Sequence, residues 1–352
     1  IIFIGKNSIN RNNKIRTALM NGLLSEELSN KINADKFYKD IYWDKYFFEN
    51  NIIFLIDYLS QFSPLKAVFS KVIGSATVGE AYKIKDFIVE KDNQVNYLKL
   101  INTGTIDPFT SLWGIKKTQY IKGGYSKPII EKLNLASISK TRLIQSESPK
   151  IIIAGMSIRV EAFYDVGEYC AGKSTSIILD NPQKLKTLTG LLNSKIVSFW
   201  FSKYYNSLSM AGGFFNIGNN ELNNIPLPKI EFSNNTLITL VDYLLSLHNK
   251  ETPQILSHTD NTRIASHLED ILNMMVYELY FEEHMKEVGI DVLSIINEKF
   301  KMMNEKYADK DFSYLISHFY EWYQQPDNPV RQRLLLVDTR SPDIIGLINK
   351  SV

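Results

Sequence analysis

Hydrophobic periodicity divides the chain into a helical beginning, a strand-rich middle and a helical end. Residues 1–60 are expected to be mostly helical, with candidate helices over 14–30 and 47–60. Ser63-Pro64 ends this segment, because proline disfavours a helical conformation in the residue before it. From there to about residue 180 the pattern changes to short β-branched runs separated by Gly, Asn and Pro. We interpret as strands the runs 67–73, 87–89, 97–101, 151–154, 157–163 and 176–179.

The pattern returns to helix after Asn181-Pro182, which is typical of an N-cap and a first helical residue. One apolar face predicts a helix from there to about Asn206, with Leu185, Leu188, Leu192, Ile196 and Phe199 on that face. Ile225-Pro226-Leu227-Pro228 interrupts the pattern again, and the later periodicity predicts helices over 237–245, 264–279, 292–303 and 312–322. We therefore expect an α+β fold with a helical lead-in at 1–60, a β-rich body at 61–230 and an all-helical C-terminal region at 231–352.

The composition is that of a protein with packed domains, without disulfides or membrane spans. With 352 residues and 44% hydrophobic content, the chain can form about two or three such domains. The single cysteine cannot form an internal disulfide, and the longest apolar runs, such as 52–56, are far too short for a membrane span. We expect a cytoplasmic protein without a membrane partner. Because the sequence opens at Ile1, we also expect a fragment or a processed product.

The small net charge of +2 conceals an asymmetry between the two parts. Residues 1–230 carry 29 Lys and Arg against 19 Asp and Glu, whereas residues 231–352 carry 11 against 19. A genome-wide bias towards Ile, Asn and Lys would act on both parts alike, so it does not explain the reversal of sign. A basic body followed by an acidic tail indicates binding of a polyanion by the body.

Residues 167–174 (GEYCAGKS) satisfy the phosphate-loop pattern G-x-x-x-x-G-K-[ST]. That loop needs a helix directly behind it, so that the helix N-terminus meets the phosphates. Here a β-branched run follows, and Asn181-Pro182 closes it too early for such a helix. We favour a hairpin turn with Lys173 at an exposed tip, and nucleotide binding by Gly167–Ser174 is the least favoured alternative.

Motifs of several enzyme classes are missing from the sequence. One cysteine excludes a Cys-based zinc site. No Lys has Asp or Glu two positions before it, as Mg²⁺-dependent nucleases of the P-D…(D/E)-x-K type require. The segments 180–183 and 327–330 lack the second proline and the aromatic residue of the amino-methyltransferase loop. No Gly-x-Gly loop after a strand offers an S-adenosylmethionine site. We expect no catalytic residue, metal site or cofactor site in this chain.

The residues that indicate a function lie in the basic body. There, Lys and Arg can neutralise phosphates, and Asn, Gln and Arg can form hydrogen bonds with base edges. Lys116, Lys117, Lys122 and Lys203 are the expected phosphate contacts. Gln119, Asn206, Arg142 and Arg159 are the expected base readers. The full set of candidate DNA-binding residues is Lys116, Lys117, Gln119, Tyr120, Lys122, Lys127, Arg142, Arg159, Lys173, Lys203, Tyr204 and Asn206.

Several short segments resemble one family in order. Asn102-Thr103-Gly104-Thr105-Ile106 resembles the Asn-Thr-Gly-x-Ile strand entry of target-recognition domains in restriction–modification systems. Further segments resemble the TaqI-like C-terminal specificity domain: residues 150–153 and 162–165, the "Leu-Asn-Ser" helix at 191–201, the Gly-Gly turn at 212–213 and the closing segment 225–228. Residues 268–281 resemble a tail helix appended to these enzymes. The resemblance covers roughly residues 65–285.

This resemblance implies a DNA target-recognition domain of a site-specific adenine-N6 DNA methyltransferase or of a fused type II restriction–modification enzyme. The methyltransferase domain would precede Ile1 in the same polypeptide and would bind S-adenosylmethionine. The partner of the present chain would be double-stranded DNA. A free-standing specificity subunit of a multi-subunit system is the alternative; such subunits usually carry two recognition domains, and one such segment is evident here.

Overall fold

The computed structural model describes residues 14–20, 26–40, 42–69, 72–90, 96–230 and 235–352. Its N-terminal part is a hairpin of β1 (Lys14–Met20) and β2 (Glu26–Asn33), followed by α1 (Ala34–Lys39), the 3₁₀ helix η1 (Asp44–Phe47) and α2 (Asn50–Leu59). The helix predicted over 14–30 is therefore wrong. Thr17 and Asn30 donate side-chain hydrogen bonds to the Tyr46 carbonyl oxygen, at 2.7 and 2.9 Å, and these non-local contacts hold the strands against η1. The helix predicted over 47–60 is confirmed as α2.

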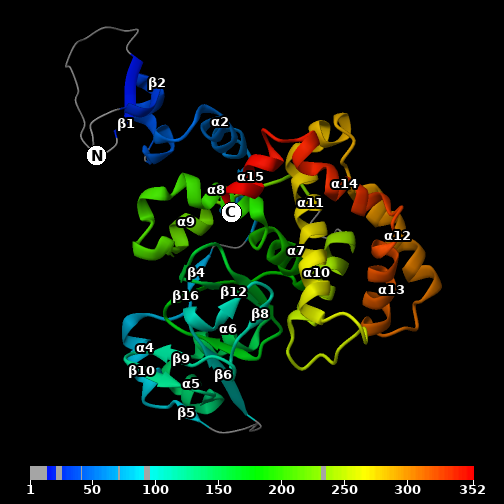
Figure 1. Ribbon diagram of the computed structural model, residues 1–352. Coiled ribbons are helices and arrows are strands. Elements are labelled where there is room, and N and C mark those ends of the chain that lie inside the picture. Colours follow the sequence, from blue (N-terminus) through cyan, green and yellow to red (C-terminus); the bar gives the residue numbers. More distant parts are fainter. Residues whose placement is uncertain (1–13, 21–25, 41, 70–71, 91–95, 231–234) are drawn as a thin grey trace.

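Two four-stranded sheets form the middle of the chain, in the lower part of Figure 1. The first is antiparallel, in the order β14 (Ala162–Asp165), β12 (Lys150–Ala154), β16 (Thr175–Ile178) and β4 (Ile73–Gly74). The second has the order β15 (Tyr169–Ala171), β6 (Tyr97–Ile101), β11 (Pro128–Glu131) and β5 (Val89–Glu90), with β15 parallel to β6. The strand predicted over 97–101 coincides with β6.

Strand β12 is buried on both faces, which explains its uninterrupted apolar sequence. Ile151 and Ile153 belong to the main core, whereas Ile152 and Ala154 face a second cluster that includes Ile101 of β6. β14 and β16 flank β12 in the first sheet, and Ile152 of β12 lies opposite Phe163 of β14 and Ile177 of β16. β12 thus links the two sheets.

Four short helices lie in the β-rich body, three of them beside the second sheet, and the sequence pattern did not predict them. They are α3 (Leu65–Val68), α4 (Val78–Lys85), α5 (Lys132–Ile138) and α6 (Lys140–Glu147). Each spans eight residues or fewer, so periodicity over a long window does not detect it. The strand predicted over 67–73 is wrong, since α3 occupies its beginning and β4 starts only at Ile73.

The "Leu-Asn-Ser" segment separates two helices where a single helix was predicted. α7 (Pro182–Leu192) ends before Asn193, and α8 (Lys195–Tyr204) begins after Ser194, whose hydroxyl accepts a hydrogen bond from the Val197 N–H. The Asn193 amide accepts from the Ala162 N–H at 3.0 Å and donates to the Ala162 carbonyl at 2.7 Å. This break therefore fastens the helices to β14.

The C-terminal region is helical, as predicted. After α9 (Asn219–Asn223) come α10 (Asn235–His248), α11 (Asn261–Glu287), α12 (Leu293–Lys306), α13 (Phe312–Gln324), α14 (Pro329–Arg340) and α15 (Ile345–Ser351), of which α14 and α15 were not predicted. One main core runs from Leu188 of α7 to Leu240 of α10 and on into the tail, so the predicted boundary at 230 does not separate two cores. β3 (Ser63–Pro64) pairs with β18 (Pro226–Leu227) and joins the two ends of the β-rich body. The whole is an α+β fold. Within the described residues, no helix combines the length and the apolar character needed to cross a membrane.

Candidate nucleic-acid interface

Asn102 organises the loops at one end of the second sheet. β6 and β15 are parallel, so the loops that follow Ile101 and Ala171 emerge side by side. The nearly buried Asn102 side chain donates to the Gln119 carbonyl oxygen at 2.9 Å and accepts from the Ser174 N–H at 3.1 Å. It thereby ties the hairpin of β9 (Thr118–Tyr120) and β10 (Gly123–Tyr125) to the turn at 172–174.

Thr103, in the 3₁₀ helix η2 (Thr103–Thr105), connects a third loop to this group. Its hydroxyl accepts from the Met156 N–H at 2.9 Å and lies 3.1 Å from the Met156 carbonyl oxygen. β13 (Met156–Ser157) in turn pairs with β17 (Phe215–Asn216), and the Ile217 N–H donates to the Gly155 carbonyl at 2.9 Å. We call the connected segments 102–105, 117–124, 155–160, 172–174 and 206–216 the loop face.

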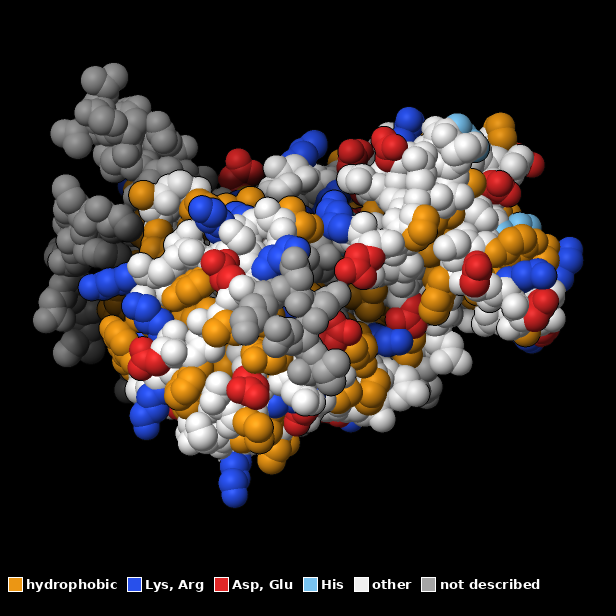
Figure 2. Space-filling model, turned by 90° about the horizontal axis from the view of Figure 1, so that it is seen from below, with side chains coloured by type: hydrophobic (Ala, Val, Ile, Leu, Met, Phe, Trp, Pro, Cys, Tyr) orange, Lys and Arg blue, Asp and Glu red, His pale blue; other side chains and the backbone are white. Residues whose placement is uncertain are grey.

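The loop face combines cations, amides and exposed apolar groups. Lys117, Gln119, Lys122 and Lys173 are exposed on it, as is Asn206. Ile121 and Lys122 have φ values of 42° and 61°, so the tight β9–β10 turn places Lys122 at its tip. Figure 2 shows the molecule from below, where Lys, Arg, Asp and Glu side chains are all scattered among apolar ones. The mixture on the loop face suits a duplex, whose phosphates need cations and whose bases need amides and apolar contacts.

Residues 96–227 match the TaqI-like C-terminal specificity domain. The match begins next to β6, ends at β18 and includes every segment of the loop face. No curated protein matches the chain. The resemblance seen in the sequence is thus confirmed over 96–227, which we call the specificity domain. A domain of this family confers DNA sequence specificity in methyltransferase-type systems.

Six of the predicted DNA-binding residues lie on the loop face of the specificity domain, namely Lys117, Gln119, Lys122, Arg159, Lys173 and Asn206. Lys116 lies near this group, since its charge and that of Arg159 both lower the pKa of the same carboxyl group, that of Glu161. Arg159 Nε lies 3.9 Å from Glu161 Oε1 and its side chain stays partly exposed. The structure thus brings these side chains to one surface, and their contacts with DNA stay predictions.

Two predicted contacts are wrong. Tyr120 is 1% exposed, because the alternation along β9 points residues 118 and 120 inwards and only Gln119 outwards. The Arg142 guanidinium is occupied within the protein: Nε donates to both Glu80 carboxylate oxygens, and Nη1 donates to the Gly74 carbonyl at 3.0 Å. Arg142 therefore fastens α6 to α4 and is not available to read a base.

Three further candidates lie away from the loop face. The Lys203 ammonium sits 5.2 Å from the centre of the Phe48 ring, and burial lowers the pKa of Lys203. Tyr204 stacks on Trp200 with ring centres 4.7 Å apart. Both residues are packed beneath the N-terminal segment. Lys127 lines a separate groove, described below.

Residues 167–174 do not form a phosphate loop. The structure places β15 inside the pattern and β16 directly after it, where a phosphate loop needs a helix. The Ser174 N–H, which would face a phosphate, is used by Asn102. The expected hairpin is also wrong, because β15 and β16 belong to different sheets, but Lys173 is exposed at the turn as expected.

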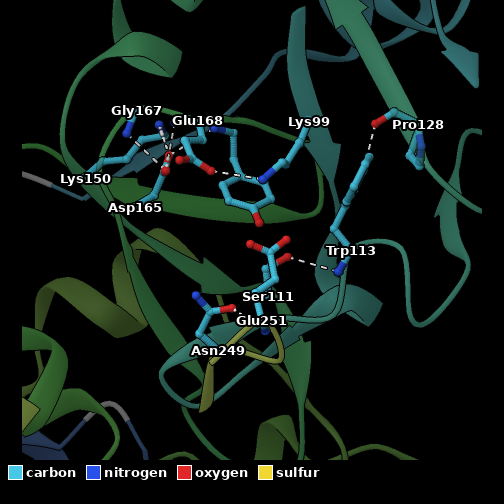
Figure 3. Close-up of polar contacts among 11 residues, drawn as sticks. Lys99, Ser111, Trp113, Pro128, Lys150, Asp165, Gly167, Glu168, Asn249 and Glu251 are labelled. Carbon is cyan, nitrogen blue, oxygen red and sulfur yellow. Dashed lines mark hydrogen bonds and ion pairs between the residues drawn. The ribbon is translucent and has the colours of Figure 1, made fainter. Parts of the chain in front are cut away.

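A groove of about 790 Å³ separates the specificity domain from the segment after α10 (Figure 3). Lys99 lies in it, 5.6 Å from the Trp113 ring centre, 5.2 Å from that of Tyr169 and 3.0 Å from Glu168 Oε2. Burial lowers the pKa of Lys99, but Tyr169 and the nearby carboxylates outweigh it and the net pKa is raised. Lysines and carboxylates both line the groove, including Lys127 and Glu251, so its charge does not favour a phosphate backbone. Among the described residues, no group of three or more His, Cys, Asp or Glu could hold a metal ion.

Proposed function

We propose that this chain recognises a specific sequence in double-stranded DNA as the C-terminal specificity part of an adenine-N6 DNA methyltransferase or a fused restriction–modification enzyme. The observation that carries the proposal is the loop face, in which Asn102, Thr103 and the β13–β17 pairing bring five loops of a specificity domain together. The methyltransferase domain of the same polypeptide would bind S-adenosylmethionine and perform the methyl transfer in the cytoplasm.

The residues of the loop face divide by chemistry. Lys117, Lys122 and Lys173 end in freely placed ammonium groups, which suit phosphate oxygens and fix the register of the protein on the duplex. Gln119 and Asn206 carry amides, which can form two hydrogen bonds to adenine, and Arg159 can do the same with guanine. Each good bidentate contact discriminates against the wrong base by about 1–3 kcal/mol. Lysine contacts supply affinity, and the amide and guanidinium contacts supply the choice of sequence.

The test is selection from random duplex DNA by binding and sequencing, followed by titration of the selected site with salt. We expect one enriched motif and an affinity that falls steeply as salt rises. Lys122→Ala should reduce the slope of log K against log salt by about 0.9, because one phosphate contact is lost. Gln119→Ala should leave the slope unchanged and broaden the motif at one position.

The matched control is Lys301→Ala, which removes an exposed lysine of α12 in the acidic tail. This variant should select the same motif with the same slope as the unaltered protein. Selection of no motif, or the same loss of slope in Lys301→Ala and Lys122→Ala, would contradict the assignment of the loop face.

A further inference from the structure

The loop face exposes several large apolar side chains. Side chains of this kind do not stabilise a surface that faces only water, so they indicate a binding partner. Met210 is 40% exposed and Phe214 is 44% exposed, and Met156 and Ile158 on the neighbouring loop are also exposed. The two loops are joined, since Met156 pairs with Asn216 in the β13–β17 ladder. These exposed apolar side chains therefore come from two joined loops of a surface that also carries cations and amides.

The loop that carries Met210 and Phe214 is narrow and internally bonded. The Met210 N–H donates to the Phe214 carbonyl oxygen at 2.7 Å, and the Gly213 N–H donates to the Met210 carbonyl at 3.1 Å. Gly212 and Gly213 have φ values of 83° and 77°, a left-handed conformation that favours glycine. A Cβ at Gly213 would meet no atom within 4 Å, whereas one at Gly212 would lie 3.5 Å from the Phe214 ring, so the turn is open at Gly213 and the ring lies over Gly212. The bonded turn holds Met210 and Phe214 at its two sides.

We propose that this turn is an apolar wedge that enters a groove of the target duplex and partly unstacks one base step. The binding partner of the wedge is double-stranded DNA, and this proposal rests on the proposed function. Lys117, Lys122 and Lys173 are exposed on other segments of the loop face, and their charge complements the phosphates of a duplex. Apolar side chains of this kind kink DNA when they insert between base pairs.

The wedge would make binding depend on how easily a base step deforms, a property that hydrogen bonds to base edges do not sense. Pyrimidine–purine steps unstack more easily than others, so insertion favours a sequence by its deformability. Met210 and Phe214 would then determine specificity at one step of the site without any hydrogen bond to a base. Their loss changes the choice of sequence and leaves the number of phosphate contacts as it was.

The test uses the selected duplex with 2-aminopurine placed at each position in turn. The unaltered protein should raise the fluorescence at one step, where stacking is lost. Phe214→Ala and Met210→Ala should abolish that rise and weaken the preference at that step by about tenfold or more, with an unchanged salt slope. Phe214→Leu, which keeps an apolar side chain, should retain part of both effects.

Two controls separate the wedge from other causes. Phe87→Ala removes a phenylalanine that is 38% exposed and precedes β5, at the opposite sheet edge from β15, and should change neither readout. Lys122→Ala should reduce the salt slope and retain the fluorescence rise. A variant is included in the comparison when its melting temperature lies within a few degrees of that of the unaltered protein.

Two results distinguish failure of the wedge from failure of DNA recognition. If the unaltered protein selects a motif but no position brightens, or if Phe214→Ala and Met210→Ala keep the rise and the preference, the wedge is refuted and sequence recognition stands. If the unaltered protein selects no motif, the proposed function is refuted and the wedge with it.

Discussion

Glu161 provides a sharp test of the electrostatics beside the loop face. Its side chain is 15% exposed, and burial raises the pKa of the carboxyl from 4.5 to about 7, with Asp107 adding to the rise and Arg159 and Lys116 opposing it. Between these two pKa values the native protein holds a proton that the unfolded chain has released. The free energy of unfolding therefore falls as the pH rises through this window.

The expected magnitude follows from the two pKa values. Their difference corresponds to about 3 kcal/mol, all of it present below the ordinary pKa and lost above about pH 7. Glu161→Gln keeps the shape of the protonated side chain at every pH. This variant should therefore be more stable than the unaltered protein by about 2–3 kcal/mol at pH 8, and should differ by less than about 1 kcal/mol at pH 5.

Urea unfolding at pH 5 and at pH 8 measures this difference. The matched control is Glu305→Gln on α12, an exposed carboxylate that should change stability little at either pH. An equal gain for Glu161→Gln at both pH values would show that its effect is not electrostatic. A loss of stability at pH 8 would show that the ionised carboxylate is stabilised in the native protein, contrary to the reasoning.

Three other substitutions test the bonds that hold the domain together, each by urea unfolding. Asn102→Ala leaves two backbone groups of neighbouring loops unpaired and should cost about 2–4 kcal/mol, with faster hydrogen exchange at the 172–174 turn. Asn193→Ala unfastens α7 from β14 and should cost at least about 2 kcal/mol. Lys150→Met leaves Asp165 buried without its cation and should cost about 3–5 kcal/mol, whereas Lys184→Met, which breaks an exposed pair, should cost less than about 1 kcal/mol. Equal costs for the two lysine variants would contradict the argument from burial.

Local patterns predicted the parts of the fold that local forces determine. The strand at 97–101 and the long amphipathic helices of the tail follow from alternation and helical spacing alone. The N-terminal hairpin does not, because the bonds from Thr17 and Asn30 to Tyr46 join residues that the sequence pattern treats separately. The break at Asn193 was missed for the same reason, since its partner is a backbone 31 residues away.

The candidate site was predicted in composition but not in geometry. Clustering of cations found Lys117 and Lys122, since both lie on loops close in sequence. Tyr120 could have been excluded, because a strand through Gln119 points its neighbours the other way. No local signal shows that Arg142 is occupied by Glu80, 62 residues away. The exposed Phe214 has a usable signal in the Gly-Gly pair before it, which indicates a projecting turn.

The anchoring of the loop face has a consequence for how its target can change. The bonds that assemble these loops are made by backbone groups and by Asn102 and Thr103, while the outward positions 117, 119, 122 and 173 project beyond them. The bonds that hold the loops together and the proposed DNA contacts therefore involve different residues. Under the proposed function, a library that varies Gln119 and Arg159 and keeps Asn102 and Thr103 should yield folded proteins with new DNA preferences, which would make the domain a scaffold for retargeting.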